Sequence, residues 1–141
     1  MRYVLGLAFS ENRQKVLLMN KLHPDWQKGL LNGVGGKMSE KEPQRDAMVR
    51  ECKEETNLDL PWQARGTLCG KKTQTGEAFI VYLFYAFSDK IYLYQKYEEE
   101  YPTIRPVLDL IMHPEITLAN VPFLIQYGLC QDSSYEIIVR Y

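Results

Sequence analysis

Residues 32–57 read NGVGGKMSEKEPQRDAMVRECKEETN, and this stretch decides how the chain is interpreted. The glycines at positions 33, 35 and 36 favour a loop that a ligand can approach closely, because glycine has no side chain and readily adopts positive φ. From Pro43 to Thr56 helix-forming residues predominate, so the sequence predicts a helix of about 14 residues. Asn57 suits the left-handed conformation that ends many helices.

Glu51, Glu54 and Glu55 fall on one face of this predicted helix, within an arc of about 100°. Ala47 falls within the same arc, and Val49 belongs to the opposing packing edge. Three like charges on one face repel one another unless a cation compensates them. Mg²⁺ is suited to the position, since it takes oxygen ligands and keeps waters for a phosphate substrate. The alternative is a solvated acidic face beside the basic residues of the same helix. The preceding glycine loop favours a metal-and-phosphate site, since its backbone groups can face a ligand.

The stretch is not a Walker P-loop, because Leu31 stands where the first glycine of that motif is needed and Met38 where Ser or Thr is needed. It closely resembles the Nudix box, G-x5-E-x7-R-E-U-x-E-E-x-G-U, in which U is aliphatic. The matching glycine and polar positions are Gly36, Glu42, Arg50, Glu51, Glu54 and Glu55. Two positions depart from the pattern: Cys52 replaces an aliphatic residue and Asn57 replaces the last glycine. Asn is the next best residue at a left-handed helix end.

The resemblance implies roles for the matching residues. Glu51, Glu54 and Glu55 would bind Mg²⁺, with Mn²⁺ as a substitute, together with the Gly36 carbonyl. Arg50 would pair with box carboxylates, with Glu42 as the candidate partner. A metal-activated water would attack phosphorus. The general base stays open between Glu51 and a later glutamate, and the later candidates are Glu98, Glu99 and Glu100.

Residues outside the box resemble the MutT-like branch, which hydrolyses oxidised purine nucleoside triphosphates. Asn32, in the segment that ends at Lys37, and Asn120 match positions that read the base, since an amide offers a donor and an acceptor to a purine edge. Asn32 could instead serve turn chemistry before Gly33, and Asn120 could be a helix N-cap. Trp26 would cover the base or cap the core. The expected substrate-binding residues are Asn32, Lys37, Asn120 and Trp26.

The resemblance therefore predicts Mg²⁺-dependent hydrolysis of a nucleoside triphosphate to a nucleoside monophosphate and pyrophosphate, with oxidised purine nucleotides such as 8-oxo-dGTP as a sharper hypothesis. The alternative enzyme is a pyrophosphatase for ADP-ribose, a dinucleotide or a capped RNA end. A nucleotide-sensing Nudix module without catalysis is a further alternative. All three box glutamates are present, which disfavours the sensor.

The composition limits partners and location. The chain has 141 residues with 17 Lys and Arg against 18 Asp and Glu, a net charge of −1 that argues against long nucleic acid and anionic membranes. The longest apolar run, residues 79–87, is too short to span a membrane. Three widely spaced cysteines predict reduced thiols and a cytoplasmic protein. No secretion signal is expected.

The remaining pattern predicts a single α+β domain over residues 1–141. The expected strands are 2–9, 15–19, 63–73, 77–87, 91–94, 103–109 and 135–141, with a second helix over 118–129. The resemblance implies the Nudix fold, a mixed β-sheet sandwiched between helices. The last strand could pack within the domain or pair across the edge of a homodimer.

Overall fold

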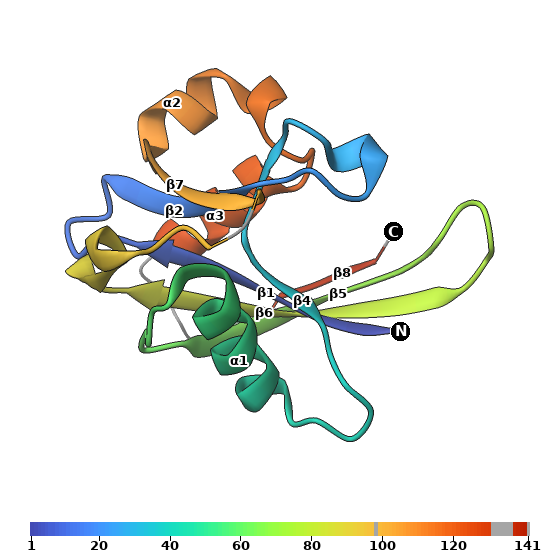
Figure 1. Ribbon diagram of the computed structural model, residues 1–141. Coiled ribbons are helices and arrows are strands. Elements are labelled where there is room, and N and C mark those ends of the chain that lie inside the picture. Colours follow the sequence, from blue (N-terminus) through green and yellow to red (C-terminus); the bar gives the residue numbers. More distant parts are fainter. Residues whose placement is uncertain (98, 131–136, 141) are drawn as a thin grey trace.

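A mixed β-sheet forms the centre of the protein in a computed structural model that describes residues 1–97, 99–130 and 137–140 (Figure 1). Its strands are β1 Arg2–Phe9, β2 Lys15–Asn20, β3 Leu31–Asn32, β4 Val34–Lys37, β5 Gln63–Lys71, β6 Ala78–Phe87, β7 Tyr101–Pro106 and β8 Ile137–Arg140. They run in the order β3-β2-β1-β6-β5-β8, while β4 pairs with β1 and β7 with β2. The pairs β1·β6 and β5·β8 are parallel and the others are antiparallel.

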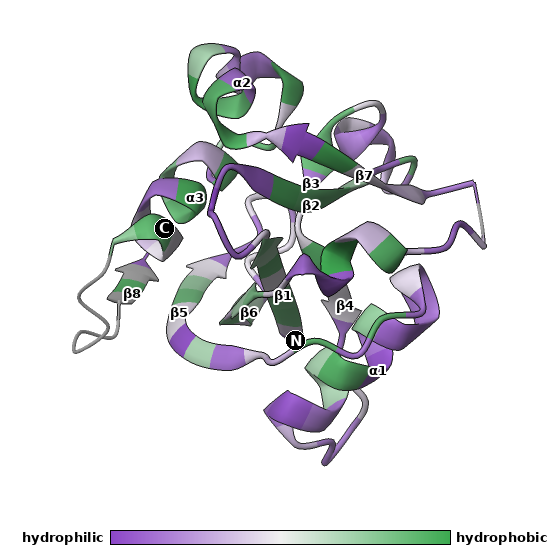
Figure 2. Cartoon of the chain, turned by 90° about the vertical axis from the view of Figure 1, so that its left-hand side faces the viewer, coloured by the Kyte–Doolittle hydropathy of each residue, from purple (hydrophilic) through white to green (hydrophobic). Residues whose placement is uncertain are grey.

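Helices cover both faces of this sheet (Figures 1 and 2). The helix α1 Gln44–Thr56 packs on one face, and α2 Val107–Met112 and α3 Val121–Leu129 pack on the other. Three short 3-10 helices lie in connections: η1 Asp25–Gln27, η2 Asp89–Leu93 and η3 Pro114–Ile116. The layered α/β/α arrangement confirms the predicted fold class.

The central strands are buried on both faces, which explains their nearly continuous apolar sequences. Along β6, Phe84 packs on the α1 side, whereas its neighbours Leu83 and Tyr85 pack on the α2 and α3 side. Successive side chains of a strand point to opposite faces, so one apolar run supplies two cores.

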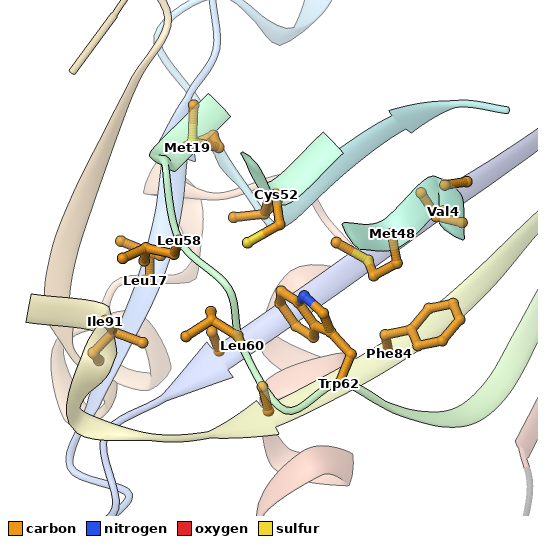
Figure 3. Close-up of a cluster of buried hydrophobic side chains, with 14 of the residues drawn as sticks. Val4, Leu17, Met19, Met48, Cys52, Leu58, Leu60, Trp62, Phe84 and Ile91 are labelled. Atoms are coloured by element: carbon orange, nitrogen blue, oxygen red, sulfur yellow. The ribbon is translucent and has the colours of Figure 1, made fainter. Parts of the chain in front are cut away.

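The core beneath α1 is packed around Trp62 (Figure 3). Trp62 lies beside Met48 of α1 and Phe84 of β6, and the residue is 3% exposed. A Cβ placed at Gly6 of β1 would lie 2.6 Å from the Trp62 ring and 2.8 Å from the Met48 methyl group. The glycine in β1 therefore lets α1 and the indole lie close to the sheet.

Several predicted elements differ from the structure. Residues 91–93 lie in η2 and Tyr94 follows as its C-cap, so the predicted strand over 91–94 is wrong. The Ser88 side chain accepts a hydrogen bond from the Lys90 amide and begins a tight turn. The strand predicted over 103–109 ends at Pro106, opposite Lys15, where β2 begins, so no strand is available to pair with the residues beyond it. Those residues instead form α2, which the sequence pattern did not indicate.

The predicted helix over 118–129 begins only at Val121, with Pro122 in its first turn, where a missing amide hydrogen is tolerated. The last strand pairs in parallel with β5 of the same chain, so it packs within the domain. Residues 135, 136 and 141 of that prediction lie outside the described residues. In the described part of the chain, no helix combines the length and apolar character needed to cross a membrane.

Candidate active site

The glycine-rich segment and α1 meet at one end of the sheet. Antiparallel pairing with β1 sets Gly36 opposite Val4 and holds β4 next to the helix. A Cβ at Gly36 would lie 2.6 Å from Oε2 of Glu51, so the absence of a side chain leaves room for that carboxylate. Gly35, at φ +153°, donates its amide hydrogen to Oε2 of Glu55 at 3.0 Å. Gly35 and Gly36, predicted to lie in a loop, instead belong to β4, which meets α1 at two of the three predicted carboxylates.

The C-terminal end of α1 agrees with the sequence interpretation, whereas the helix begins one residue later than predicted. Pro43 is its N-cap, one residue before the helix begins. Asn57 adopts the left-handed conformation, at φ 59° and ψ 23°, and its amide donates to the Lys53 carbonyl at 3.0 Å. The predicted left-handed end is therefore confirmed, and asparagine serves in place of the glycine of the motif.

Arg50 links the carboxylates of the site. Its Nε and Nη2 donate to the two oxygens of Glu42 at 2.8 and 3.0 Å, which confirms the predicted pairing. Its Nη1 donates to Glu51 at 2.7 Å and to Glu54 at 3.2 Å, and Nη2 also reaches the Lys37 carbonyl at 3.2 Å. A planar guanidinium suits this role, because its donors have a fixed geometry.

The carboxylates differ strongly in electrostatic environment. Burial raises the pKa of Glu55 to about 8, although the Gly35 amide and Lys21 oppose the shift. Burial also raises the pKa of Glu51, against the hydrogen bond from Arg50. The hydrogen bonds from Arg50 and the Ser39 amide lower the pKa of Glu42 to about 2. The site thus contains two carboxyl groups whose charged forms are disfavoured by burial, an effect that a bound cation would counteract.

The donor set fits a hard divalent cation in its chemistry. Carboxylate and carbonyl oxygens are the ligands that Mg²⁺ and Mn²⁺ take. As the side chains stand, however, no three acidic, histidine or cysteine groups among residues 1–97, 99–130 and 137–140 are gathered around one point. Arg50 contacts both Glu51 and Glu54, and Glu55 is turned to the Gly35 amide. Binding of a cation therefore requires these carboxylates to exchange a present donor for the ion.

Two side chains of α1 depart from the expected faces. Ala47, placed by periodicity within the acidic arc, is fully buried in the core beneath α1. Val49, assigned to the packing edge, is 41% exposed. The buried face of α1 is centred on Met48 and Cys52, so it lies closer to the acidic stripe than the angles alone suggested.

A cleft of about 1290 Å³ adjoins the box. Gly35 and Gly36 line it and so connect it to the carboxylates of α1. Its other walls come from the segment after β2, from the hairpin between β5 and β6, and from the start of α3. The four residues predicted to bind substrate all line this cleft: Trp26, Asn32, Lys37 and Asn120.

The environments of the four predicted substrate-binding residues bear on the alternative roles considered for them, which were core capping, turn formation and helix capping. Trp26 is 70% exposed in η1, which excludes a role in capping the core. Asn32 Oδ1 accepts a hydrogen bond from the Gly33 amide at 2.8 Å, so the turn interaction is present within the cleft wall. Asn120 is the N-cap residue of α3 by position, but its side chain makes no capping hydrogen bond to the helix. Lys37 is exposed at the end of β4.

The later glutamates lie in different situations. Glu98 lies outside the described residues. Glu99 is exposed. Glu100 accepts hydrogen bonds from Lys21 Nζ at 2.6 Å and from the amides of Leu22 and His23 at 3.0 and 2.8 Å. Burial acts to raise the pKa of Glu100, but these hydrogen bonds outweigh it and keep the pKa below its usual value.

Sequence reasoning missed three lysines of the cleft. Lys21, Lys71 and Lys72 all line it, although they come from different strands and loops. The adjacent pair Lys71-Lys72 was visible as a basic dipeptide, but only the pairing of β5 with β6 brings it to the cleft. Lys21 is half-buried, with 16% of its side chain exposed, and its position follows from the pairing of β2 with β7.

Comparison with known proteins assigns the chain to a family. The family model of the NUDIX domain matches residues 1–112. The fold is similar to that of the NUDIX domain of Shewanella oneidensis NrtR, solved with ADP ribose, at TM-score 0.72 and 21% identity over 89% of this chain and 84% of that one. A MutT protein from Bacillus halodurans has TM-score 0.72 and 17% identity over 97% and 86% of the two chains.

A MutT protein from Methanosarcina mazei Go1 has TM-score 0.70 and 17% identity, over 91% of each chain. These identities establish a shared fold. Among curated proteins no match was found. The family model covers most of the chain, including the whole of the box, and the fold agrees with it. The chain therefore belongs to the Nudix hydrolase family.

Proposed function

We propose that this protein hydrolyses a nucleoside triphosphate to a nucleoside monophosphate and pyrophosphate with the help of Mg²⁺. The observation that carries this proposal is the joining of Gly35 and Gly36 to the box carboxylates at the edge of the cleft. A polyphosphate that enters the cleft at these glycines meets Glu55 and Glu51 directly behind them. Few positively charged groups are needed elsewhere, since a cation held by the carboxylates attracts the phosphates.

Each box residue has a proposed part. Glu51, Glu54, Glu55 and the Gly36 carbonyl hold Mg²⁺, for which Mn²⁺ substitutes. When bound, the ion neutralises phosphate charge and lowers the pKa of a bound water. Arg50 keeps Glu51 and Glu54 in place and is itself oriented by Glu42 through two hydrogen bonds. The reaction then relies mainly on positioning and charge neutralisation.

The walls of the cleft are proposed to select the base. Trp26 offers an exposed indole face on which a base can stack. Asn32 and Asn120 present amides to the edge of a purine, and Lys37 lies next to Gly36, where a phosphate would enter. The sharper hypothesis is that an oxidised guanine nucleotide is the preferred substrate. Equal turnover of 8-oxo-dGTP and dGTP, with Asn32→Ala and Asn120→Ala equal to wild type, would refute it.

ADP-ribose is a second candidate substrate. The cleft volume of about 1290 Å³ exceeds the range of roughly 300–1,000 Å³ typical of small-molecule sites. It extends to Lys71 and Lys72, which could meet a group on the far side of the diphosphate. The NrtR domain with a similar fold was solved with ADP ribose. This candidate predicts that Lys71→Met raises KM for ADP-ribose more than KM for a nucleoside triphosphate.

One experiment tests both candidates. The protein is incubated with nucleoside triphosphates, nucleotide sugars, dinucleotides and ADP-ribose, each with Mg²⁺ and with Mn²⁺, and the products are separated. Pyrophosphate and a nucleoside monophosphate from a triphosphate support the first proposal. AMP and ribose phosphate from ADP-ribose support the second. Tight nucleotide binding with no product from any compound would overturn both and favour a sensor.

A further inference from the structure

The segment after β2 forms one wall of the cleft and is tied to the rest of the protein at few points. Residues 21–30 are closed at their base by two backbone hydrogen bonds, from Lys21 to the Leu30 carbonyl and from Gly29 to the Lys21 carbonyl. Within this loop, η1 has no buried residue. Apolar packing therefore does not fix the position of Trp26, which lies in η1 and lines the cleft.

Glu100 supplies the missing attachment. In the described part of the chain, every hydrogen bond that joins residues 22–28 to another element is accepted by the Glu100 carboxylate. Its Oε1 accepts from the amides of Leu22 and His23, and its Oε2 accepts from Lys21 Nζ. Both oxygens are thus occupied by three donors from the same short segment.

The sheet brings these groups together. The antiparallel pairing of β2 with β7 sets Asn20 opposite Tyr101, so the next pair along the same register is Lys21 and Glu100. Both side chains are largely shielded, at 16% and 19% exposed, which makes the ion pair less sensitive to solvent than a surface pair. The pair also lies within electrostatic reach of Glu55.

We propose that Glu100 is a positioning residue, which fixes Lys21 and the loop 21–30 so that Trp26 stands over the cleft. This inference rests on the proposed function, because it assigns the loop to the substrate cleft of that reaction. It also gives Glu100 a role other than general base. The three hydrogen bonds stabilise the charged carboxylate, so Glu100 takes up a proton less readily than an ordinary glutamate and suits a structural role better than that of a base.

Two substitutions at Glu100 distinguish a positioning residue from a general base. Glu100→Gln keeps a carbonyl oxygen that can accept from the Leu22 and His23 amides but loses the charge that holds Lys21, whereas Glu100→Ala loses every contact. We expect KM to rise about threefold in the first and about tenfold in the second, with kcat within about twofold of wild type. A lost general base would instead lower kcat by roughly 100-fold or more in both variants alike. That result would overturn the proposal.

A second readout does not require turnover. Lys28 is exposed within the loop, so trypsin cleavage after it reports how often the loop opens. We expect cleavage about tenfold faster in Glu100→Ala and an intermediate rate in Glu100→Gln. Glu115→Gln is the matched control, because Glu115 pairs with His113 on the exposed surface. Equal rates in all four proteins would overturn the inference. Absence of hydrolysis by the wild type, with faster cleavage in Glu100→Ala, would refute only the proposed reaction.

Discussion

Replacement of Gly36 by alanine tests whether the position of the Glu51 carboxylate controls the reaction. The added Cβ would lie 2.6 Å from Oε2 of Glu51 and 2.7 Å from its carboxyl carbon. To reach ordinary contact near 3.4 Å, the carboxylate must move by about 0.8 Å. Glu51 is a flexible side chain, so it can make this movement without displacement of the backbone. The substitution therefore shifts one proposed ligand and leaves the fold in place.

The expected loss follows from this displacement. A misplacement of about 1 Å at a reacting centre can cost roughly 100-fold in rate. We expect kcat/KM for the preferred nucleotide to fall about 100-fold, equivalent to about 2.7 kcal/mol of transition-state stabilisation. The free energy of unfolding should change by less than about 1 kcal/mol. Steady-state kinetics at saturating Mg²⁺ and urea unfolding followed by circular dichroism measure the two quantities.

Gly76→Ala is the matched control for this prediction. Gly76 lies in the turn between β5 and β6, at φ +69°, and a Cβ there would meet nothing within 4 Å. This substitution should cost about 1 kcal/mol of stability through backbone strain and leave kcat/KM unchanged. If Gly36→Ala folds normally and retains kcat/KM within about twofold of wild type, the position of the Glu51 carboxylate does not control the reaction.

Three further outcomes are expected. Glu54→Gln should lose most activity through weaker metal binding with unchanged circular dichroism, and activity retained at saturating Mg²⁺ would place the essential ligands elsewhere. Tyr85→Phe should lower the free energy of unfolding by about 1 kcal/mol in urea titrations, because the buried hydroxyl donates to the Leu124 carbonyl at 2.8 Å; an unchanged midpoint would contradict this. Glu55 has a pKa of about 8 in the native state and an ordinary pKa of 4.5 in the unfolded state. Between pH 4.5 and pH 8 the native state therefore binds a proton that the unfolded state has lost. The free energy of unfolding consequently falls as the pH rises through 8. In EDTA, unfolding midpoints should therefore decrease from pH 5 to pH 9, and Glu55→Gln should remove part of this decrease.

The arrangement of the box residues was predictable because it depends on residues that are close together in the sequence. Helical spacing places Glu51, Glu54 and Glu55 together, and asparagine is a known left-handed helix end. The contact between Arg50 and Glu42 also followed from the motif and is confirmed. These features depend only on the helix and on the few residues before it in the sequence.

Other features depended on partners that the sequence does not reveal. Residues 107–109 resemble a strand, yet the pairing of β7 with β2 ends at Lys15 and Pro106. Beyond it, among the described residues, only the Val107 amide meets the Gln14 carbonyl, and the chain forms α2. Tyr92 alternates with apolar neighbours like a strand residue but lies in η2. In both cases the hydrogen-bonding partner, and not the local propensity, decided the structure.

The sequence by itself determined the family, the carboxylate face of α1 and the glycine segment before it, because the residue types and their spacing carry that information locally. Only the tertiary structure decided which donors each carboxylate meets. Glu55 accepts the Gly35 amide across a gap of 20 residues, and Glu100 meets Lys21 across 79. The first pair depends on the packing of α1 against β4, and the second on the register of β2 with β7, which the whole sheet fixes through the burial of both its faces.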